Sequence, residues 1–139
     1  LNLCDSQLQI QGDNQRLLQV FVNLLNNAAD ASDSGASVRI QSYETDTSVL
    51  IHVEDQGCGI PAALQKRLFE PFFTTKDPGQ GTGLGLSLVY SIIQEHYGSI
   101  QIESPVDVAE NRGTRVILTL PRMMPTPFSD RTNDRDNSE

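Results

Sequence analysis

The stretch VRIQSYETDTSVLIHVED, residues 38–55, decides the fold class of this chain. Apolar and polar residues alternate in Val38–Tyr43 and again in Val49–Asp55, which predicts two half-buried strands. The polar residues Glu44–Ser48 between them are typical of a hairpin loop. Consecutive strands of this kind argue against a doubly wound parallel sheet, in which strands alternate with helices.

Helices are expected on both sides of this hairpin. The first begins at a cap residue, Asp13 or Asn14, and ends at the turn Asp33-Ser34-Gly35. A short helix can cover Pro61–Phe69, and a longer one Leu84–Tyr97. The apolar residues of the first helix recur at threes and fours and are expected on one face: Leu17, Leu18, Phe21, Leu24, Leu25 and Ala28.

Three more strands complete the expected order of elements. Alternation predicts a strand at residues 7–11, before the first helix, and two final strands at Ser99–Glu103 and Thr114–Leu120. The order is therefore strand, helix, two strands, short helix, loop, helix and two strands. We expect an α/β two-layer sandwich, with a mixed or antiparallel sheet covered on one face by helices.

Length and charge limit the possible functions. The chain has 139 residues, enough for about one domain, and 10 basic against 18 acidic side chains give a net charge of −8. This balance argues against non-specific binding to nucleic acid or to an anionic membrane, which needs clustered Lys and Arg. No apolar run approaches the ~20 residues of a membrane-spanning helix.

The domain is expected to cover residues 1–122. In residues 123–139 the only apolar side chain after Met124 is Phe128, so we expect this tail to be disordered. Cys4 and Cys58 are too few for a disulfide scaffold and are typical of reduced thiols in a cytoplasmic domain. The chain does not begin with Met, which suggests a piece of a longer protein.

The first candidate site is NLLNNAAD, residues 23–30, on the first helix. At about 100° per residue, Asn23, Asn27 and Asp30 fall together on a face separate from the apolar one. A solvated polar face is the ordinary alternative. Asparagine disfavours helix interiors, however, and amide oxygens four residues apart can both reach a hard cation.

The second candidate site is DQGCG, residues 55–59, at the end of a predicted strand. Two glycines after an acid allow a sharp turn and the close approach of a ligand. An ordinary strand-ending turn is the alternative, and this motif alone is a weak signal.

The third candidate site is GQGTGLGL, residues 79–86, with four glycines at a spacing of two before a helix. Glycine-rich backbone that leads into a helix N-terminus favours anion and phosphate binding. A flexible hinge is the alternative. The spacing matches neither the G-x-x-x-x-G-K-[ST] loop nor the G-x-G-x-x-G loop.

The fourth candidate site is LFEPFFTTK, residues 68–76. Its three Phe residues are expected to attach the start of the long loop, residues 70–83, to the body of the domain. Loops of this length are usually functional or mobile. Lys76 could meet a phosphate, although an exposed, solvated Lys is the more common case.

Together and in this order, these motifs make the chain resemble the catalytic, ATP-binding domain of a sensor histidine kinase, most closely the nitrogen-regulator-like branch. The matching segments are the N box Asn23–Ala31, the first G box Asp55–Gly59, the F box Phe69–Phe73, the second G box Gly81–Leu86 and the last glycine motif Gly113-Thr114. The resemblance implies a mixed five-stranded sheet covered by three helices, the Bergerat ATP-binding fold.

The resemblance also implies how Mg-ATP would be held. Asp55 would accept a hydrogen bond from the exocyclic amine of adenine, while Gly57 and Gly59 would let the base pack closely. Asn27 would bind the Mg²⁺ that bridges the triphosphate, and Asn23 would lie beside it as a second metal ligand.

The phosphates would lie against the backbone of Gly81, Gly83 and Gly85 and the following helix N-terminus. Asn23 and Lys76 are the implied catalytic residues, with Lys76 contacting the γ-phosphate. The other residues that the resemblance places at the nucleotide are Asp30, Ile60, Phe72, Thr75, Thr82, Leu84, Leu86 and Thr114.

The implied partners are other domains. The phosphoacceptor histidine of such kinases lies in a separate upstream dimerisation domain, and the phosphoryl group then passes to the receiver domain of a response regulator. His52 and His96 lack the His-Glu or His-Asp motif and are expected to be structural or surface residues. This fragment is expected to be a cytoplasmic monomer, and its parent protein a homodimer.

Three alternatives remain open. Gyrase-like ATPases use a Glu four residues before the metal-binding Asn as general base, and here that position is Asn23, which cannot act as one. An anti-sigma-factor type serine kinase is less favoured by the FEPFFTTK segment. A docking module that binds nucleotide without catalysis is less favoured because all the boxes are intact.

Overall fold

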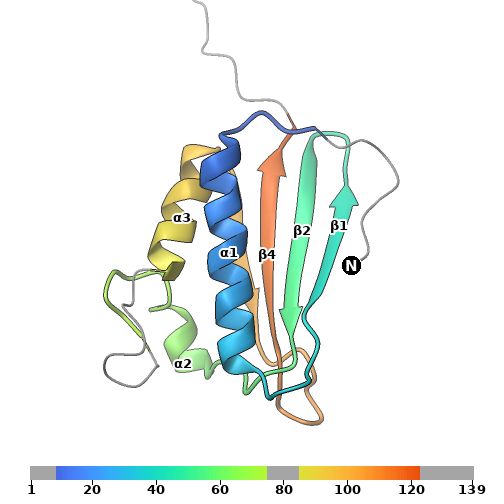
Figure 1. Ribbon diagram of the computed structural model, residues 1–139, viewed down its shortest axis with the longest axis vertical. Coiled ribbons are helices and arrows are strands. Elements are labelled where there is room, and N and C mark those ends of the chain that lie inside the picture. Colours follow the sequence, from blue (N-terminus) through green and yellow to red (C-terminus); the bar gives the residue numbers. More distant parts are fainter. Residues whose placement is uncertain (1–8, 75–84, 123–139) are drawn as a thin grey trace, which may run out of the picture.

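The computed structural model describes residues 9–74 and 85–122 and shows a two-layer α/β sandwich, as predicted (Figure 1). The elements are α1 Asn14–Ala31, β1 Arg39–Glu44, β2 Ser48–Asp55, α2 Ala62–Gln65, α3 Gly85–Glu95, β3 Ser99–Glu103 and β4 Thr114–Pro121. The predicted hairpin, the two long helices and the two final strands are all present, with ends within about two residues of those expected. None of the described helices is long and apolar enough to cross a membrane.

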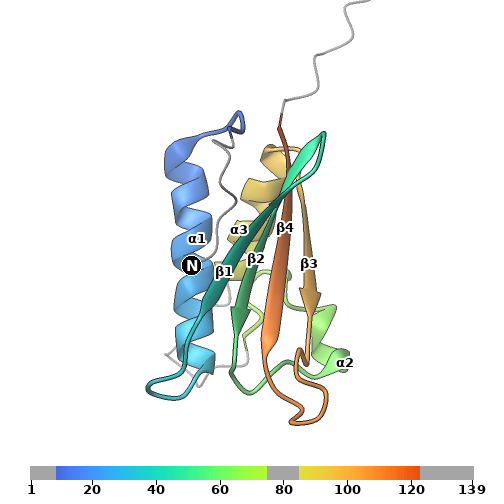
Figure 2. The same ribbon diagram turned by 90° about the vertical axis from the view of Figure 1, so that its right-hand side faces the viewer.

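The sheet has the order β1-β2-β4-β3 and is antiparallel at each pairing. Of the two alternatives that the residue pattern left open, the described residues form the antiparallel sheet, and not the mixed sheet that the resemblance implies. β2 and β3 run in the same direction, but β4 lies between them, so they never pair (Figure 2).

The expected fifth strand is not confirmed. Residues 7 and 8 lie outside the described residues, and residues 9–11 belong to no strand although Ile10 packs against the core. The expectation of three covering helices is not confirmed either. α1 packs on β2 and α3 on β3, whereas α2 is a single turn below α3, level with one end of the strands (Figure 1).

The segment after Pro61 winds as a series of turns rather than as the expected helix to Phe69. Its backbone bonds join residues three apart, from Arg67 N to Leu64 O, from Glu70 N to Arg67 O and from Phe73 N to Glu70 O. These short-range bonds end α2 after four residues.

The core lies between the two long helices and the sheet. Its buried residues are Val20, Leu24, Val53, Val89, Ile92, Ile93, Leu118 and Leu120. On α1 the buried face follows Val20, Leu24 and Ala28, and the expectation that Leu18 and Leu25 belong to it is wrong, since 63% and 38% of their surfaces are exposed. At 100° per residue these two leucines lie more than a quarter turn from the buried face.

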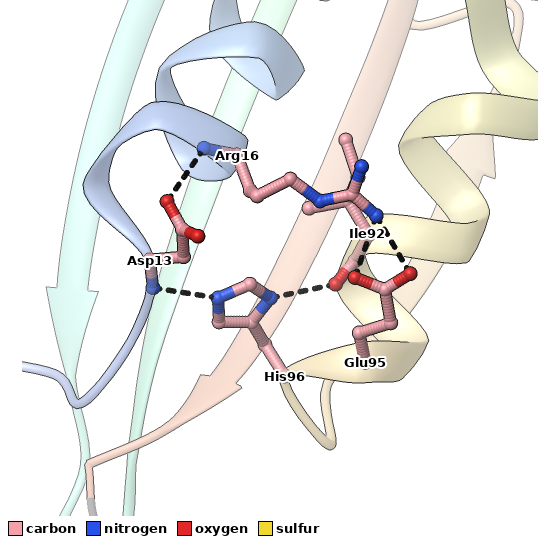
Figure 3. Close-up of polar contacts among 5 residues, drawn as sticks. All are labelled: Asp13, Arg16, Ile92, Glu95 and His96. Atoms are coloured by element: carbon pink, nitrogen blue, oxygen red, sulfur yellow. Dashed lines mark hydrogen bonds and ion pairs between the residues drawn. The ribbon is translucent and has the colours of Figure 1, made fainter.

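The start of α1 is tied to the end of α3 (Figure 3). Asp13 is the N-cap, and its Oδ1 accepts hydrogen bonds from the N–H groups of Gln15 and Arg16 at 2.9 and 3.1 Å. The backbone N–H of Asp13 donates to Nε2 of the buried His96, and Arg16 pairs with both carboxylate oxygens of Glu95. His96 is thus a structural residue, as expected.

Candidate functional site

The first component of the candidate site is Asp55, the last residue of β2. Its side chain is only 8% exposed, and Oδ1 accepts a hydrogen bond from the N–H of Gly57 at 2.9 Å. Burial raises the pKa of this carboxyl, the charge of Glu54 adds to the rise, and hydrogen bonds from the Gly57 and Thr114 backbones oppose it. A buried carboxylate with an elevated pKa and fixed orientation is typical of a ligand-recognition site.

Gly57 has a structural role that the sequence did not indicate. A Cβ at this position would lie 2.3 Å from the carbonyl oxygen of Ala31, at the end of α1. The turn after Asp55 therefore packs directly on the helix backbone, and the N–H of Cys58 donates to the same oxygen at 3.3 Å. Within the chain itself, close packing of the helix and the turn already requires glycine, whether or not a base also packs there.

Gly59 and Gly113 hold this turn against the last loop. Both have a left-handed backbone, with φ of 75° and 87°, which favours glycine. The N–H of Gly113 donates to the carbonyl of Gly57 at 2.9 Å, so two predicted glycine motifs lie side by side.

The second component is the asparagine face of α1, which meets the start of α3. Nδ2 of Asn23 is 3.5 Å from the carbonyl oxygen of Gly85. Among the described residues, a Cβ on Gly85 would lie closest to Nδ2 of Asn27, at 4.0 Å. The N box is thus adjacent to Gly85, the last glycine of the second G box.

The aromatic segment is attached to α3 as expected through Phe69, whereas the ring contact of Phe73 is local, to the residue just before the segment. The Phe69 ring lies 5.4 Å from that of Tyr90 on α3, and the Phe73 ring accepts the Arg67 guanidinium at 4.5 Å. Phe72, by contrast, is 76% exposed with a φ of 66°. Its assignment to the nucleotide stays a prediction.

Several residues that were predicted to bind the nucleotide cannot be assigned to either component of the site from the structure. Thr75, Lys76, Gly81, Thr82, Gly83 and Leu84 lie outside the described residues. Leu86 packs against the core, and Asp30 is exposed near the end of α1. The expected places of these residues at the nucleotide therefore stay predictions.

An open cavity of about 430 Å³ includes Asp55 but not the asparagine face. One wall is the loop after β3, which contributes Val106, Asp107 and Arg112. The loop closes on itself through backbone bonds between Asp107 and Arg112 at 2.9 and 3.0 Å.

Two residues that the sequence did not single out also touch the site. Ser104 and Gln65 make hydrogen bonds to the glycine turn around Ile60. Neither lies in a recognisable motif, and only their tertiary contacts reveal them.

Comparison with known proteins identifies the family. Residues 12–124 match the family model described as histidine kinase-, DNA gyrase B-, and HSP90-like ATPase. The chain is 45% identical over 102 residues to the signal transduction histidine-protein kinase AtoS of Escherichia coli, covering 72% of this chain and 16% of AtoS. It is 39% identical over 115 residues to sporulation kinase A of Bacillus subtilis, covering 83% of this chain and 18% of that kinase.

Solved structures agree with this assignment. A nucleotide-free form of the catalytic domain of histidine kinase ThkA matches with a TM-score of 0.77 and 34% identity, covering 88% of this chain and 78% of that one. The mycobacterial sensor histidine kinase MprB matches with a TM-score of 0.75 and 31% identity, covering 84% and 76%. The chain spans less than a fifth of AtoS and of sporulation kinase A.

The family match covers both components of the site, the buried Asp55 with its glycine turn and the asparagine face against Gly85. The chain belongs to the histidine kinase-, DNA gyrase B- and HSP90-like ATPase family, and is a catalytic ATP-binding domain of the sensor histidine kinase type.

Proposed function

We propose that this domain binds Mg-ATP and transfers the γ-phosphoryl group to a histidine in a separate dimerisation domain of its parent protein. The observation that carries the proposal is the meeting of the asparagine face of α1 with Gly85 at the start of α3, on the helix layer that also packs against the Asp55 turn. Helix α1 then connects the two components, with the asparagine face meeting Gly85 and Ala31, at its end, meeting the Asp55 turn.

Asp55 would recognise adenine. A carboxylate only accepts hydrogen bonds, so it fits the exocyclic amine of adenine and repels the carbonyl that guanine carries at the same position. Its orientation is set by the Gly57 and Thr114 backbones, which support binding without rearrangement.

The start of α3 would receive the phosphates. The N–H groups at the N-terminus of this 11-residue helix favour an anion, and Gly85 adds no side chain at that end. Gly81, Thr82, Gly83 and Lys76 would complete the phosphate site as predicted from the sequence.

The asparagines fit a magnesium ion by their chemistry. Amide oxygens are hard ligands, and Mg²⁺ usually keeps several waters and shares phosphate oxygens, so one or two protein ligands suffice. The amino group of Asn23 faces the Gly85 carbonyl, which leaves its oxygen as the ligand atom beside Asn27. Bound magnesium would neutralise phosphate charge during transfer.

The residue types favour transfer over hydrolysis. Activation of water needs a general base, and the position next to the metal site is the amide of Asn23, which has no comparable basicity. The acceptor would instead be supplied by the parent protein, and a response regulator receiver domain would take the phosphoryl group next. We place this domain in the cytoplasm, where ATP and such a receiver are available.

Two measurements test the proposal. Titration calorimetry of the chain with Mg-ATP should show binding, and Asp55→Asn should weaken it by about 1.5–3 kcal/mol because a charge-assisted acceptor is lost. Radioactive ATP should label a separately supplied dimerisation domain but not this chain alone. Absence of Mg-ATP binding, or acid-labile phosphate on His52 or His96, would contradict the proposal.

A further inference from the structure

The hydroxyl of Ser104, one residue beyond β3, joins three segments of the nucleotide site. Its Oγ accepts a hydrogen bond from the N–H of Ile60 at 2.7 Å and donates one to the carbonyl of Gly113 at 2.9 Å. The hydroxyl of Thr114 lies 3.3 Å away. A serine hydroxyl has one proton and two acceptor positions, so Thr114 must be the donor and the capacity of Ser104 is fully used.

Gln65 of α2 supports this meeting point of Ile60, Ser104 and the Gly113-Thr114 loop, which we call the junction. Its Nε2 donates to the carbonyl of Ile60 and to the carbonyl of Ser104, each at 3.0 Å. The one-turn helix α2 thereby connects the end of the glycine turn to the end of β3. Both residues are half-buried, so these bonds are partly shielded from water.

Two short series of hydrogen bonds connect the junction to the carboxylate of Asp55. Gly113 donates to the carbonyl of Gly57, whose own N–H donates to Asp55 Oδ1, each at 2.9 Å. Thr114, whose hydroxyl meets Ser104, donates its backbone N–H to the same carboxylate. The two backbone donors that orient Asp55 are thus held by the residues that Ser104 bridges.

We propose that Ser104, supported by Gln65, is a positioning residue that fixes the Asp55 carboxylate for adenine and so contributes to the selection of ATP over GTP. This inference rests on the proposed function. Ser104 touches no reacting group and acts only through the Gly57 turn and the Gly113-Thr114 loop.

The test compares Ser104→Ala with Thr45→Ala as a matched control. Thr45 Oγ1 likewise accepts from a backbone N–H and donates to a backbone carbonyl, both of Ser48, but in the β1–β2 hairpin at the opposite end of β2. Thr45→Ala removes two exposed hydrogen bonds and Ser104→Ala removes three half-buried ones, so the control shows what the loss of a bonded hydroxyl far from the site does to both readouts. Gln65→Leu is a second variant of the junction, and it tests the proposal if Ser104→Ala does not fold.

Two readouts are measured on each variant. The first is the affinity for ATP and for GTP, by displacement of a fluorescent ATP analogue. The second is the titration of the Asp55 carboxyl, by carbon NMR without nucleotide, which depends on the donors that orient it.

Ser104→Ala should lower ATP affinity about tenfold, lower the preference for ATP over GTP several-fold, and raise the Asp55 pKa as its backbone donors loosen. Gln65→Leu should act in the same direction, and Thr45→Ala should leave both readouts unchanged. Unchanged affinity with an unchanged titration, or equal losses for ATP and GTP with an unchanged titration, would overturn the inference. A native chain that binds no ATP would instead overturn the proposed function, while the titration would still report on the junction.

Discussion

The backbone N–H of Asp13 donates to Nε2 of His96 at 3.0 Å, across 83 positions of sequence. The other ring nitrogen, Nδ1, lies 2.7 Å from the carbonyl of Ile92. Since Nε2 accepts, the proton must be on Nδ1, and the buried ring is neutral and bonded at both nitrogens. A single side chain thereby joins the N-cap of α1 to the last turn of α3.

We predict that His96→Phe lowers the free energy of unfolding by about 2 kcal/mol, because the partly buried bond from the Asp13 N–H and the bond of the buried ring to Ile92 are both lost. Urea denaturation measures the change. Arg16→Gln is the control: it breaks the neighbouring exposed pair with Glu95 and should cost less than about 1 kcal/mol. Equal small losses for the two variants would show that the His96 bonds contribute little.

Gly57→Ala should destabilise the fold by about 3 kcal/mol or more, because the added methyl would meet the backbone of Ala31, which cannot rotate away. Gly35→Ala is a useful comparison. Gly35 has a φ of 86° and nothing within 4 Å of the added Cβ, so its cost should be limited to about 1–2 kcal/mol of backbone strain. Thermal or urea unfolding that ranks Gly35→Ala as the more damaging variant would contradict the packing of the turn on α1.

The elevated pKa of Asp55 predicts the sign of a pH effect on stability. Between its ordinary value of 3.8 and the raised value, the native state holds more protons than the unfolded state, so its contribution to the free energy of unfolding falls as pH rises. Asn at this position does not titrate. The stability of the native chain minus that of Asp55→Asn should therefore increase when the pH is lowered from 7 through this window. Urea denaturation at several pH values measures the difference, and a decrease on acidification would be the opposite result.

Asn27→Ala should remove most of the magnesium dependence of ATP binding, because one hard oxygen ligand is lost beside Gly85. Calorimetry with and without a chelator measures that dependence. Asn26→Ala is the matched control, since Asn26 is the adjacent amide on α1 and is exposed. If both variants keep the full effect of Mg²⁺, Asn27 is not the metal ligand.

The sequence by itself determined the two long helices, the hairpin and the two final strands, together with most of the candidate motifs. The hairpin of residues 38–55 follows from the alternation of apolar and polar residues, and the two long helices follow from apolar residues spaced three or four positions apart. Both patterns depend only on residues that are close in the sequence. The motifs around Asn27 and Asp55 were visible because their residue types are unusual in a helix interior and at a strand end.

Only the tertiary structure decided how those elements meet. The place of β4 between β2 and β3, the exposure of Leu18 and the packing of Gly57 on Ala31 all depend on contacts between distant segments. Periodicity indicates that a helix has an apolar face, but which residues are buried depends on where the sheet and the other helix lie. Ser104 belongs to no local pattern for the same reason, since its partners Ile60 and Gly113 lie 44 and 9 positions away and meet it only after the chain has folded.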